Sequence, residues 1–352
     1  MDDKGYTFTP LAVLLVIPIM ILAASYGDIA NEINNLSQIV IGGDVTYSTA
    51  HNIITIMEKT AQDSGRNAAY RATREVIDKE ASIVKNPFLT DGRYYIKVKI
   101  AEGLNNNVIE ACKSMEAETG RNITINGQDI NNQTRSLFSP NDIEIYQNDP
   151  FGFWVKLKPG IPITVTQTNQ NFTGYTPPNI VTYVSIEGLE DPYVWVNSKH
   201  RRSNIIYKYR YYESYMGSID YHFADDNDGT RLYRLWDCLN GTNNTSGMEM
   251  RPYYFLDPQG LTFFDRLENK TNNTSPGPNS AKMSTFILGE PLYEEFGARN
   301  ISCLDHEYFN GVLGSKSIYM QKNKDWFRDP MGRIFFISNH YYGVFNLKDK
   351  YN

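Results

Sequence analysis

The feature that most constrains the fold is an uncharged run of 21 residues, Tyr6 to Tyr26, which follows a short charged leader, Met1 to Gly5. At about 1.5 Å of rise per residue, a helix of this length covers roughly 31 Å, enough to cross the hydrocarbon core of a bilayer. We therefore expect a partly transmembrane helix at the N-terminus. The rest of the chain is expected to lie outside the membrane.

The junction between leader and run is more informative than the run alone. Lys4-Gly5 meets Tyr6-Thr7-Phe8-Thr9-Pro10 and then a long apolar segment. This resembles the class III signal peptide of archaeal type IV pilin-like proteins. The resemblance implies that a prepilin-type peptidase cuts between Gly5 and Tyr6 and leaves the apolar segment on the mature protein. Glycine suits the position before the cut because it has no side chain.

The junction departs from the bacterial pilin pattern in two ways. Pro10 stands where bacterial pilins carry a glutamate, and Lys4 is the one basic residue of the leader. Two other interpretations of the run stay open. One is an uncut signal anchor. The other is a secretory signal peptide cut near Ala23-Ala24-Ser25, although Asp2 and Asp3 do not suit its basic first region.

Residues 27–86 are expected to form an amphipathic helical stalk. Apolar residues recur at helical spacing from Ile29 to Val40, Gly42-Gly43 suggests a flexible break, and a second helix is expected from Val45 to about Val84. Asn86-Pro87 would end it, because proline disfavours a helical residue before it. In pilin-like proteins such a helix packs partly on a globular head. The alternative is a coiled-coil stalk that holds a dimer.

Residues 87–352 are expected to form an extracellular, β-rich head. The fold class is therefore α+β, with a long, partly transmembrane N-terminal helix before a β-rich globular head. Residues 169–179 are expected to be a linker or turn that divides the head. Helices are expected at 108–118 and 230–239. Strands are expected at 94–100, 153–157, 161–165, 180–186, 193–196, 317–320 and 333–337.

The number of glycosylation sequons favours an exterior location. The N-x-[ST] pattern occurs more often than composition alone explains, and attached glycans must project into solvent. An Asn-rich loop composition is the alternative explanation. The eleven candidates are Asn35, Asn122, Asn132, Asn171, Asn240, Asn243, Asn244, Asn269, Asn272, Asn273 and Asn300.

The net charge and the cysteine count exclude some classes of function and of fold stabilisation. A net charge of −6 does not suit general binding to nucleic acid, which requires basic surface. The three cysteines fit no zinc spacing and are too few for a disulfide framework. In an oxidising compartment, Cys238 and Cys303 are the expected disulfide pair, which leaves Cys112 as a free thiol.

Motifs for catalysis are mostly missing, so we expect no enzyme, no cofactor and no metal. His306-Glu307 begins a metalloprotease-like motif, but Asn310 stands where the second histidine is required. The acidic stretch Asp225 to Gly229 does not fit an EF-hand and is expected to be an ordinary turn.

A tyrosine-rich segment offers a possible recognition surface. As a strand, it would place Tyr207, Tyr209 and Tyr211 on one face. An exposed face of this kind could bind glycans or a partner subunit. The alternative, which we rate higher, is that this face packs inward.

Three functional hypotheses follow. The first is a pilin-like cell-surface protein, a minor pilin or adhesion subunit in or near a filament, with partners that include the membrane, the peptidase and other pilin-like subunits. The second is a membrane-anchored receptor or module that binds glycans or the cell wall. The third is an anchored surface hydrolase around Asp305 and His306.

Overall fold

The computed structural model describes residues 5–81, 86–167, 170–199, 204–210, 230–243, 250–270, 277–288, 303–312, 314–321, 323–345 and 347–351. Its architecture is α+β. The chain divides into two compact units that interleave along the sequence. Unit 1 comprises Met1–Met57, Asn107–Leu137 and Pro159–Pro177. Unit 2 comprises Glu58–Asn106, Phe138–Lys158 and Pro178–Asn352.

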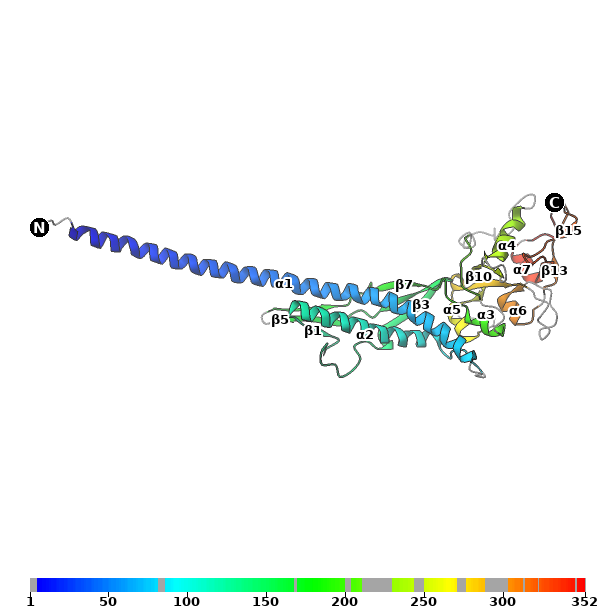
Figure 1. Cartoon of the computed structure of the whole chain (residues 1–352), viewed down its shortest axis with the longest axis horizontal. Helices are drawn as coiled ribbons and strands as arrows, with labels where there is room; N and C mark the ends of the chain where they lie inside the picture. The colour runs from blue at the N-terminus through cyan, green and yellow to red at the C-terminus, as the bar shows by residue number, and fades with distance from the viewer. Residues whose placement is uncertain are drawn as a thin grey trace. The chain divides into compact units, whose positions relative to one another are not determined.

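The first helix, α1, runs without interruption from Gly5 to Ala81 (Figure 1). The expected break at Gly42-Gly43 is wrong. Glycine weakens a helix by about 1 kcal/mol per residue relative to alanine, but close packing around Gly42 outweighs this cost. The Arg121 guanidinium donates to the Gly42 carbonyl oxygen at 3.3 Å, and a Cβ on Gly42 would collide with the Gln170 side chain. Gly42 is thus a point of close approach within unit 1.

The expectation of a partly transmembrane helix is also wrong. In the part of the chain that the structure describes, no helix combines the length and the apolar character needed to cross a membrane.

Unit 1 contains a four-stranded antiparallel sheet in the order β2-β1-β5-β6. Its strands are β1 (Asn122–Ile125), β2 (Gln128–Asp129), β5 (Pro162–Gln167) and β6 (Gln170–Tyr175). Strand β5 confirms the strand expected at 161–165. Strand β6 occupies residues 170–175 of the expected linker or turn, and a boundary between the two units falls just after it, between Pro177 and Pro178. Phe172 of β6 contacts Tyr47 of α1, with ring centroids 5.4 Å apart, and so fixes this edge strand to the helix.

In unit 2 the last part of α1 packs beside the start of α2 (Gly92–Thr119), and Figure 1 shows the two helices side by side. The strand expected at 94–100 is wrong, because this segment belongs to α2. Ile96, Ile100 and Leu104 are fully buried, and their spacing of four residues is helical. The helix expected at 108–118 is confirmed as the second half of α2.

A three-stranded antiparallel sheet in the order β3-β4-β7 also belongs to unit 2. Its strands are β3 (Ile143–Asp149), β4 (Gly152–Leu157) and β7 (Val181–Ser185), which confirm the strands expected at 153–157 and 180–186. Gly65 of α1 lies directly against this sheet: a Cβ there would be 2.6 Å from Val184 Cγ2. The missing side chain lets the helix approach the sheet closely.

The C-terminal part of unit 2 is built around strands β10 (Tyr254–Leu261), β11 (Met283–Ile287) and β12 (Cys303–Leu304). Helix α4 (Thr230–Asn240) confirms the helix expected at 230–239. The other helices are α3 (Pro192–Asn197), α5 (Phe263–Glu268), α6 (Asp305–Phe309), α7 (Asn339–Val344) and the 3-10 turns η1 (Pro140–Asp142) and η3 (Asn279–Ala281).

The strand expected at 193–196 is wrong, because α3 occupies these residues. The Asp191 side chain accepts from the Tyr193 backbone N–H, and Pro192 stands at the first helical position, where its missing N–H costs nothing. The core of this region is aromatic, with Phe255, Phe286 and Phe345 in mutual contact.

Short ladders complete unit 2. They are β8 (Thr242–Asn243) with β9 (Met250–Arg251), β13 (Lys316–Ser317) with β16 (Phe336–Ile337), and β14 (Tyr319–Met320) between β15 (Asp325–Trp326) and β17 (Lys350–Tyr351). Strands β14 and β16 lie within the late strand regions expected at 317–320 and 333–337, and β13 overlaps the first of them at Ser317.

Candidate functional site

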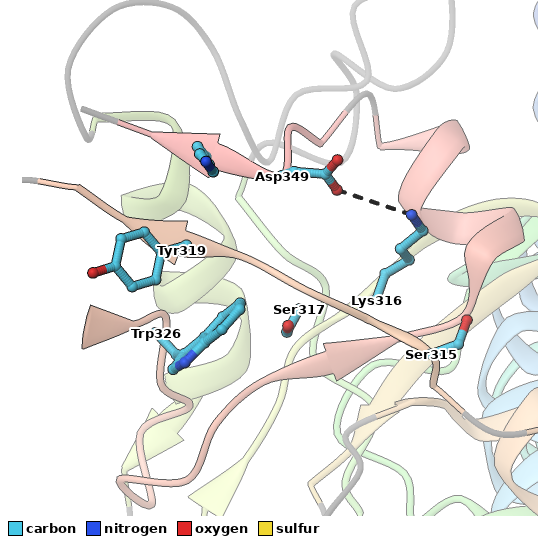
Figure 2. Close-up of a pocket in the computed structure, with 7 residues that line it drawn as sticks. Ser315, Lys316, Ser317, Tyr319, Trp326 and Asp349 are labelled. Carbon is cyan, nitrogen blue, oxygen red and sulfur yellow. Dashed lines mark ion pairs between the residues drawn. The ribbon is translucent and has the colours of Figure 1, made fainter. Parts of the chain in front are cut away.

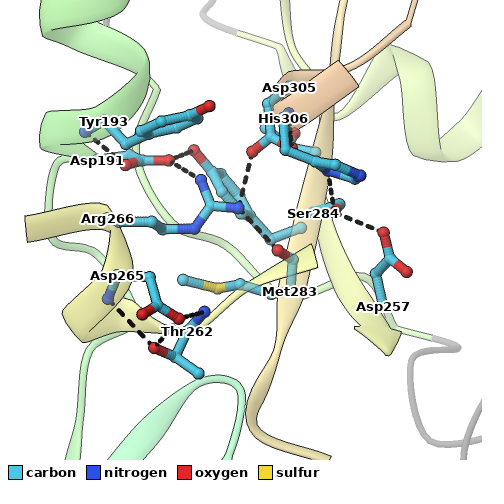
Figure 3. Close-up of polar contacts among 12 residues, drawn as sticks. Asp191, Tyr193, Asp257, Thr262, Asp265, Arg266, Met283, Ser284, Asp305 and His306 are labelled. Carbon is cyan, nitrogen blue, oxygen red and sulfur yellow. Dashed lines mark hydrogen bonds and ion pairs between the residues drawn. The ribbon is translucent and has the colours of Figure 1, made fainter. Parts of the chain in front are cut away.

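A dense group of polar side chains among the described residues is a buried network in unit 2, centred on Arg266 of α5 (Figure 3). The Arg266 guanidinium donates to Asp191 Oδ2 at 2.6 Å and to the Met283 carbonyl oxygen at 2.7 Å. It also pairs with Asp305 Oδ2 at 2.7 Å. Tyr254 donates its hydroxyl hydrogen to Asp191 Oδ2 at 2.7 Å. One arginine thus links α3, α5, α6 and strand β11.

The same network continues through His306 at the start of α6. His306 Nδ1 lies 3.1 Å from Ser284 Oγ, and His306 Nε2 lies 3.2 Å from the Tyr341 hydroxyl. Both hydroxyls donate to Asp257 Oδ2, each at 2.6 Å. Because their hydrogens point to Asp257, both oxygens accept from the imidazole. His306 therefore donates from both nitrogens, as a charged imidazolium does.

The electrostatics agree with this arrangement. Burial alone would lower the pKa of His306, but the hydrogen bond to Asp305 and the charges of Asp257, Asp305 and Glu307 outweigh burial and raise it. For Asp305, an acid, burial alone would raise the pKa, but Arg266 and His306 hold that pKa below its usual range. Burial raises the pKa of Asp191, opposed by Arg266 and Tyr254. In this network, acidic and basic side chains alternate in the order Asp191, Arg266, Asp305 and His306, and all four are buried in the core.

This arrangement differs from a nucleophilic triad. In a triad the serine hydroxyl hydrogen-bonds to a neutral histidine that can take its proton. Here Ser284 donates to Asp257, and His306 has no free lone pair. Ser284, Asp257 and His306 are also buried, with at most 3% of each residue exposed. In the described residues no group of three His, Cys, Asp or Glu side chains could hold a metal ion. The contacts of Asp305 and His306 are therefore those of a buried core network.

A pocket of about 480 Å³ in unit 2 is a candidate site for a ligand. This volume falls within the range of small-molecule sites, about 300–1,000 Å³. Figure 2 shows the rings of Tyr319 and Trp326 on one side, the ion pair of Lys316 and Asp349 on the other, and Ser317 between them. The complete lining is Ser315, Lys316, Ser317, Tyr319, Trp326, Asp349 and Lys350.

Local structure fixes the walls of this pocket. Tyr319 of β14 and Trp326 of β15 are directly opposite each other in the ladder, with ring centroids 5.3 Å apart and planes at 77°. Strand β17 pairs with β14 in parallel and carries Lys350. The Tyr342 hydroxyl donates to Asp349 Oδ1 at 2.8 Å and so holds the carboxylate at the rim. This pocket is not evident from the sequence, because residues 315–326 meet residues 349–350 only through the pairing of β14 with β17.

Residues 207–210 do not form the strand that would place Tyr207, Tyr209 and Tyr211 on one face. Tyr207 is exposed, but Tyr209 is buried in the core and donates its hydroxyl hydrogen to the Arg234 carbonyl oxygen at 3.0 Å. Tyr211 lies outside the described residues. Tyr209 thus packs inward, which was the alternative interpretation.

An exposed apolar stripe lies on α1. We define this stripe by Tyr26, Ile29, Ile33, Leu36 and Val40, whose exposed fractions run from 52% to 68%. Successive members are separated by three or four residues, so they share one face of the helix. From Thr46 onward, α1 has buried residues in every turn. The stripe is therefore a row of exposed apolar side chains on one face of α1, and Ile41 and Tyr47 beyond it are exposed as well.

The sequons that the structure describes differ in exposure. Asn122, Asn132, Asn171 and Asn269 are exposed, and Asn240 is half-buried at the end of α4. The side chains of the other six, Asn35, Asn243, Asn244, Asn272, Asn273 and Asn300, lie outside the described residues. Glycosylation of all these sites stays a prediction.

Cys238 does not form the disulfide that was predicted with Cys303. Cys238 is a free, buried thiol, and its Sγ lies 3.9 Å from the Tyr253 carbonyl oxygen. Cys112 is also free and buried, and burial raises its pKa to about 12. The side chain of Cys303 lies outside the described residues. Cys238 belongs to the apolar cluster beneath α4, where it behaves as a small hydrophobic residue.

Two further predictions fall outside what the structure describes. The turn Asp225 to Gly229 is among the residues left undescribed, as is Lys4 of the leader. Gly5 and Tyr6 are the first residues of α1, and nothing is described of the Tyr6 side chain. Cleavage between Gly5 and Tyr6 stays a prediction.

Comparison of the chain with protein-family models, with curated proteins and with solved structures finds no match. The functional argument therefore depends on the residues and geometry described above.

Proposed function

We propose that this protein is a cell-surface structural protein of the type IV pilin-like class, a minor pilin or adhesion subunit with an outward-facing, glycosylated head. The single observation that carries the proposal is the apolar stripe on α1. In this role the stripe packs against the equivalent helix of neighbouring subunits, either copies of this chain or other pilin-like proteins.

The spacing of the stripe suits helix packing. Steps of three, four, three and four residues average 3.5, the period at which two helices keep one apolar seam in contact. Burial of a large apolar side chain contributes about 1.5–3 kcal/mol, so five of them supply on the order of 10 kcal/mol before the entropy cost of association. This gain is of the same order as the cost of association, about 4–15 kcal/mol, so the stripe can offset that cost.

The leader supports the same role. In the pilin-like class, cleavage after a glycine releases a subunit whose N-terminal helix can enter a filament. The Lys4-Gly5-Tyr6 junction fits this processing by resemblance. Exposed sequons such as Asn132 and Asn171 suit an exterior surface, because glycans there would meet no packed side chains.

The test is a pair of double variants expressed in the cells that make the protein. Ile33→Lys with Leu36→Lys places two charges in the stripe. Asn31→Lys with Asn34→Lys places the same charges, at the same spacing, on exposed polar positions of α1. The amount of protein in sheared surface filaments is then measured by immunoblot.

The stripe variant should be lost from the sheared fraction while total protein is unchanged, because two buried lysines are incompatible with an apolar seam. The polar-face variant should remain. Equal amounts of both variants in the sheared fraction would refute assembly through this stripe.

A carbohydrate-binding role is the second candidate, and the pocket beside Tyr319 and Trp326 is the observation that favours it. Carbohydrate binding by this pocket would be compatible with the role of an adhesion subunit.

A further inference from the structure

We infer that the pocket lined by Tyr319, Trp326 and Lys316 binds a sugar that carries a carboxylate, such as a uronic acid residue of a surface polysaccharide. This inference does not depend on filament assembly, because the pocket lies wholly within unit 2. Three features of the site carry it: an exposed aromatic ring held in place, a polar wall opposite, and a positive balance of charge.

The aromatic wall is suited to a sugar ring. Trp326 has 42% of its surface exposed. The edge-to-face contact with Tyr319 fixes the indole before any ligand arrives. A rigid aromatic surface with two rotatable bonds loses little entropy on binding, and the apolar C–H face of a pyranose can stack on it.

The polar wall supplies partners for hydroxyl and carboxylate groups. Ser315, Lys316, Ser317 and Asp349 present hydroxyl, ammonium and carboxylate groups to the pocket (Figure 2). Lys316 Nζ lies 5.5 Å from the centre of the Tyr342 ring, within cation–π distance, so the ring favours an ammonium group at this wall. Asp349 Oδ1 already accepts from Tyr342, so the carboxylate is oriented. A mixed wall of this kind is more suited to a polyhydroxylated ligand than to an apolar one.

Charge distinguishes an acidic sugar from a neutral one. The lining contains two lysines, Lys316 and Lys350, and one acid, Asp349, so its formal charge is positive in a protein whose net charge is −6. The ion pair of Lys316 with Asp349 is long, at 4.0 Å, and both side chains are exposed. A pair of this kind contributes little to stability, so Lys316 can turn to a ligand carboxylate at small cost.

The experiment is a calorimetric titration of the full chain with the tetrasaccharide of galacturonic acid. The methyl-esterified tetrasaccharide is the matched ligand, because it keeps the rings and removes the charge. We expect the acid to bind with a dissociation constant on the order of 1 mM or tighter. The ester should bind at least fivefold more weakly, and added salt should reduce the difference, since exposed charges are screened.

Variants locate the site. Trp326→Ala should weaken binding of the acid at least tenfold. Trp236→Ala, which removes a comparably exposed tryptophan from α4, should leave it unchanged. Lys316→Gln should remove most of the preference for acid over ester. The inference is overturned if the acid does not bind, if acid and ester bind equally, or if Trp326→Ala binds as the original protein does.

Discussion

At the scale of single residues, Arg266 holds the C-terminal part of unit 2 together. Its guanidinium is fully buried and pairs with Asp191 and Asp305, which come from different helices. A buried charge pair gives less net stability than its geometry suggests, because both charges lose their hydration. Removal of one partner is strongly destabilising, because the remaining charges stay buried without an opposite charge.

We therefore predict that Arg266→Met lowers the free energy of unfolding by about 3–5 kcal/mol, the usual loss when one member of a buried ion pair is removed. Urea denaturation followed by circular dichroism measures the change. The control is Arg328→Met, because Arg328 pairs with Asp325 at the surface and solvent compensates for its loss. Similar midpoints for both variants would show that the buried network does not stabilise unit 2.

The second residue-scale prediction concerns pH and His306. Its pKa is raised in the folded protein above the ordinary value of 6.5. A raised pKa means that the folded state binds the proton more tightly, so this stability is complete below about pH 6.5 and is lost as pH rises through the folded pKa. The loss is about 1.4 kcal/mol for each unit of the shift.

Urea midpoints between pH 6 and pH 9 test this prediction. The original protein should become less stable across the range, and His306→Gln should show a flatter profile whatever its absolute stability. His340→Gln is the control, because His340 is exposed on α7. A profile for His306→Gln as steep as that of the original protein would contradict the proposed imidazolium.

The sequence gives little warning of these residue-scale roles. His306 and Asp305 attracted attention as possible catalytic groups, but burial assigns them to the core. No local signal marks Arg266, because the short helix Phe263–Glu268 also contains the charged residues Asp265 and Glu268. Several partners of Arg266 and His306, among them Asp191, Ser284 and Tyr341, are distant in the chain, so only the fold brings them together.

At the scale of elements, the long helices show why local patterns mislead. Residues 94–100 alternate polar and apolar side chains and so predict a strand. The same residues also satisfy a helical period that continues through Ile100, Leu104 and Val108. The helical period extends over more residues than the alternation does, so the segment forms a helix, which buries one continuous apolar face. Helix α3 was also missed, although Asp191-Pro192 is a typical helix start, with an N-cap residue followed by proline at the first helical position.

Two glycines of α1 give a prediction at this scale. A Cβ on Gly65 would lie 2.6 Å from Val184 Cγ2, and the branched valine cannot move aside easily. We expect Gly65→Ala to lower the free energy of unfolding by about 1–2 kcal/mol, since overpacking outweighs the gain in helix propensity. Thermal unfolding measures the change.

Gly43 is the matched control on the same helix. No atom lies within 4 Å of the position that its Cβ would occupy. Gly43→Ala should therefore stabilise the protein by about 0.5–1 kcal/mol. Stabilisation by both substitutions would mean that α1 does not lie as close to β4 and β7 as described here.

At the scale of the whole molecule, the order of segments along the chain was a poor guide to its compact units. The sequence suggested a leader, a stalk and a head in succession. The two units instead take alternating segments, and both α1 and α2 contribute to each. Interleaving of this kind leaves no composition shift to detect, because each helix simply continues from one unit into the other. The functional proposal therefore depends on the α1 stripe and the leader.

The mass of the N-terminal peptide of the protein, isolated from its native cell surface, tests the central claim most directly. A pilin-like subunit must be cut between Gly5 and Tyr6 before it can assemble. We predict a mature chain that begins at Tyr6. A chain that begins at Met1, or near Tyr26, would contradict the pilin-like assignment.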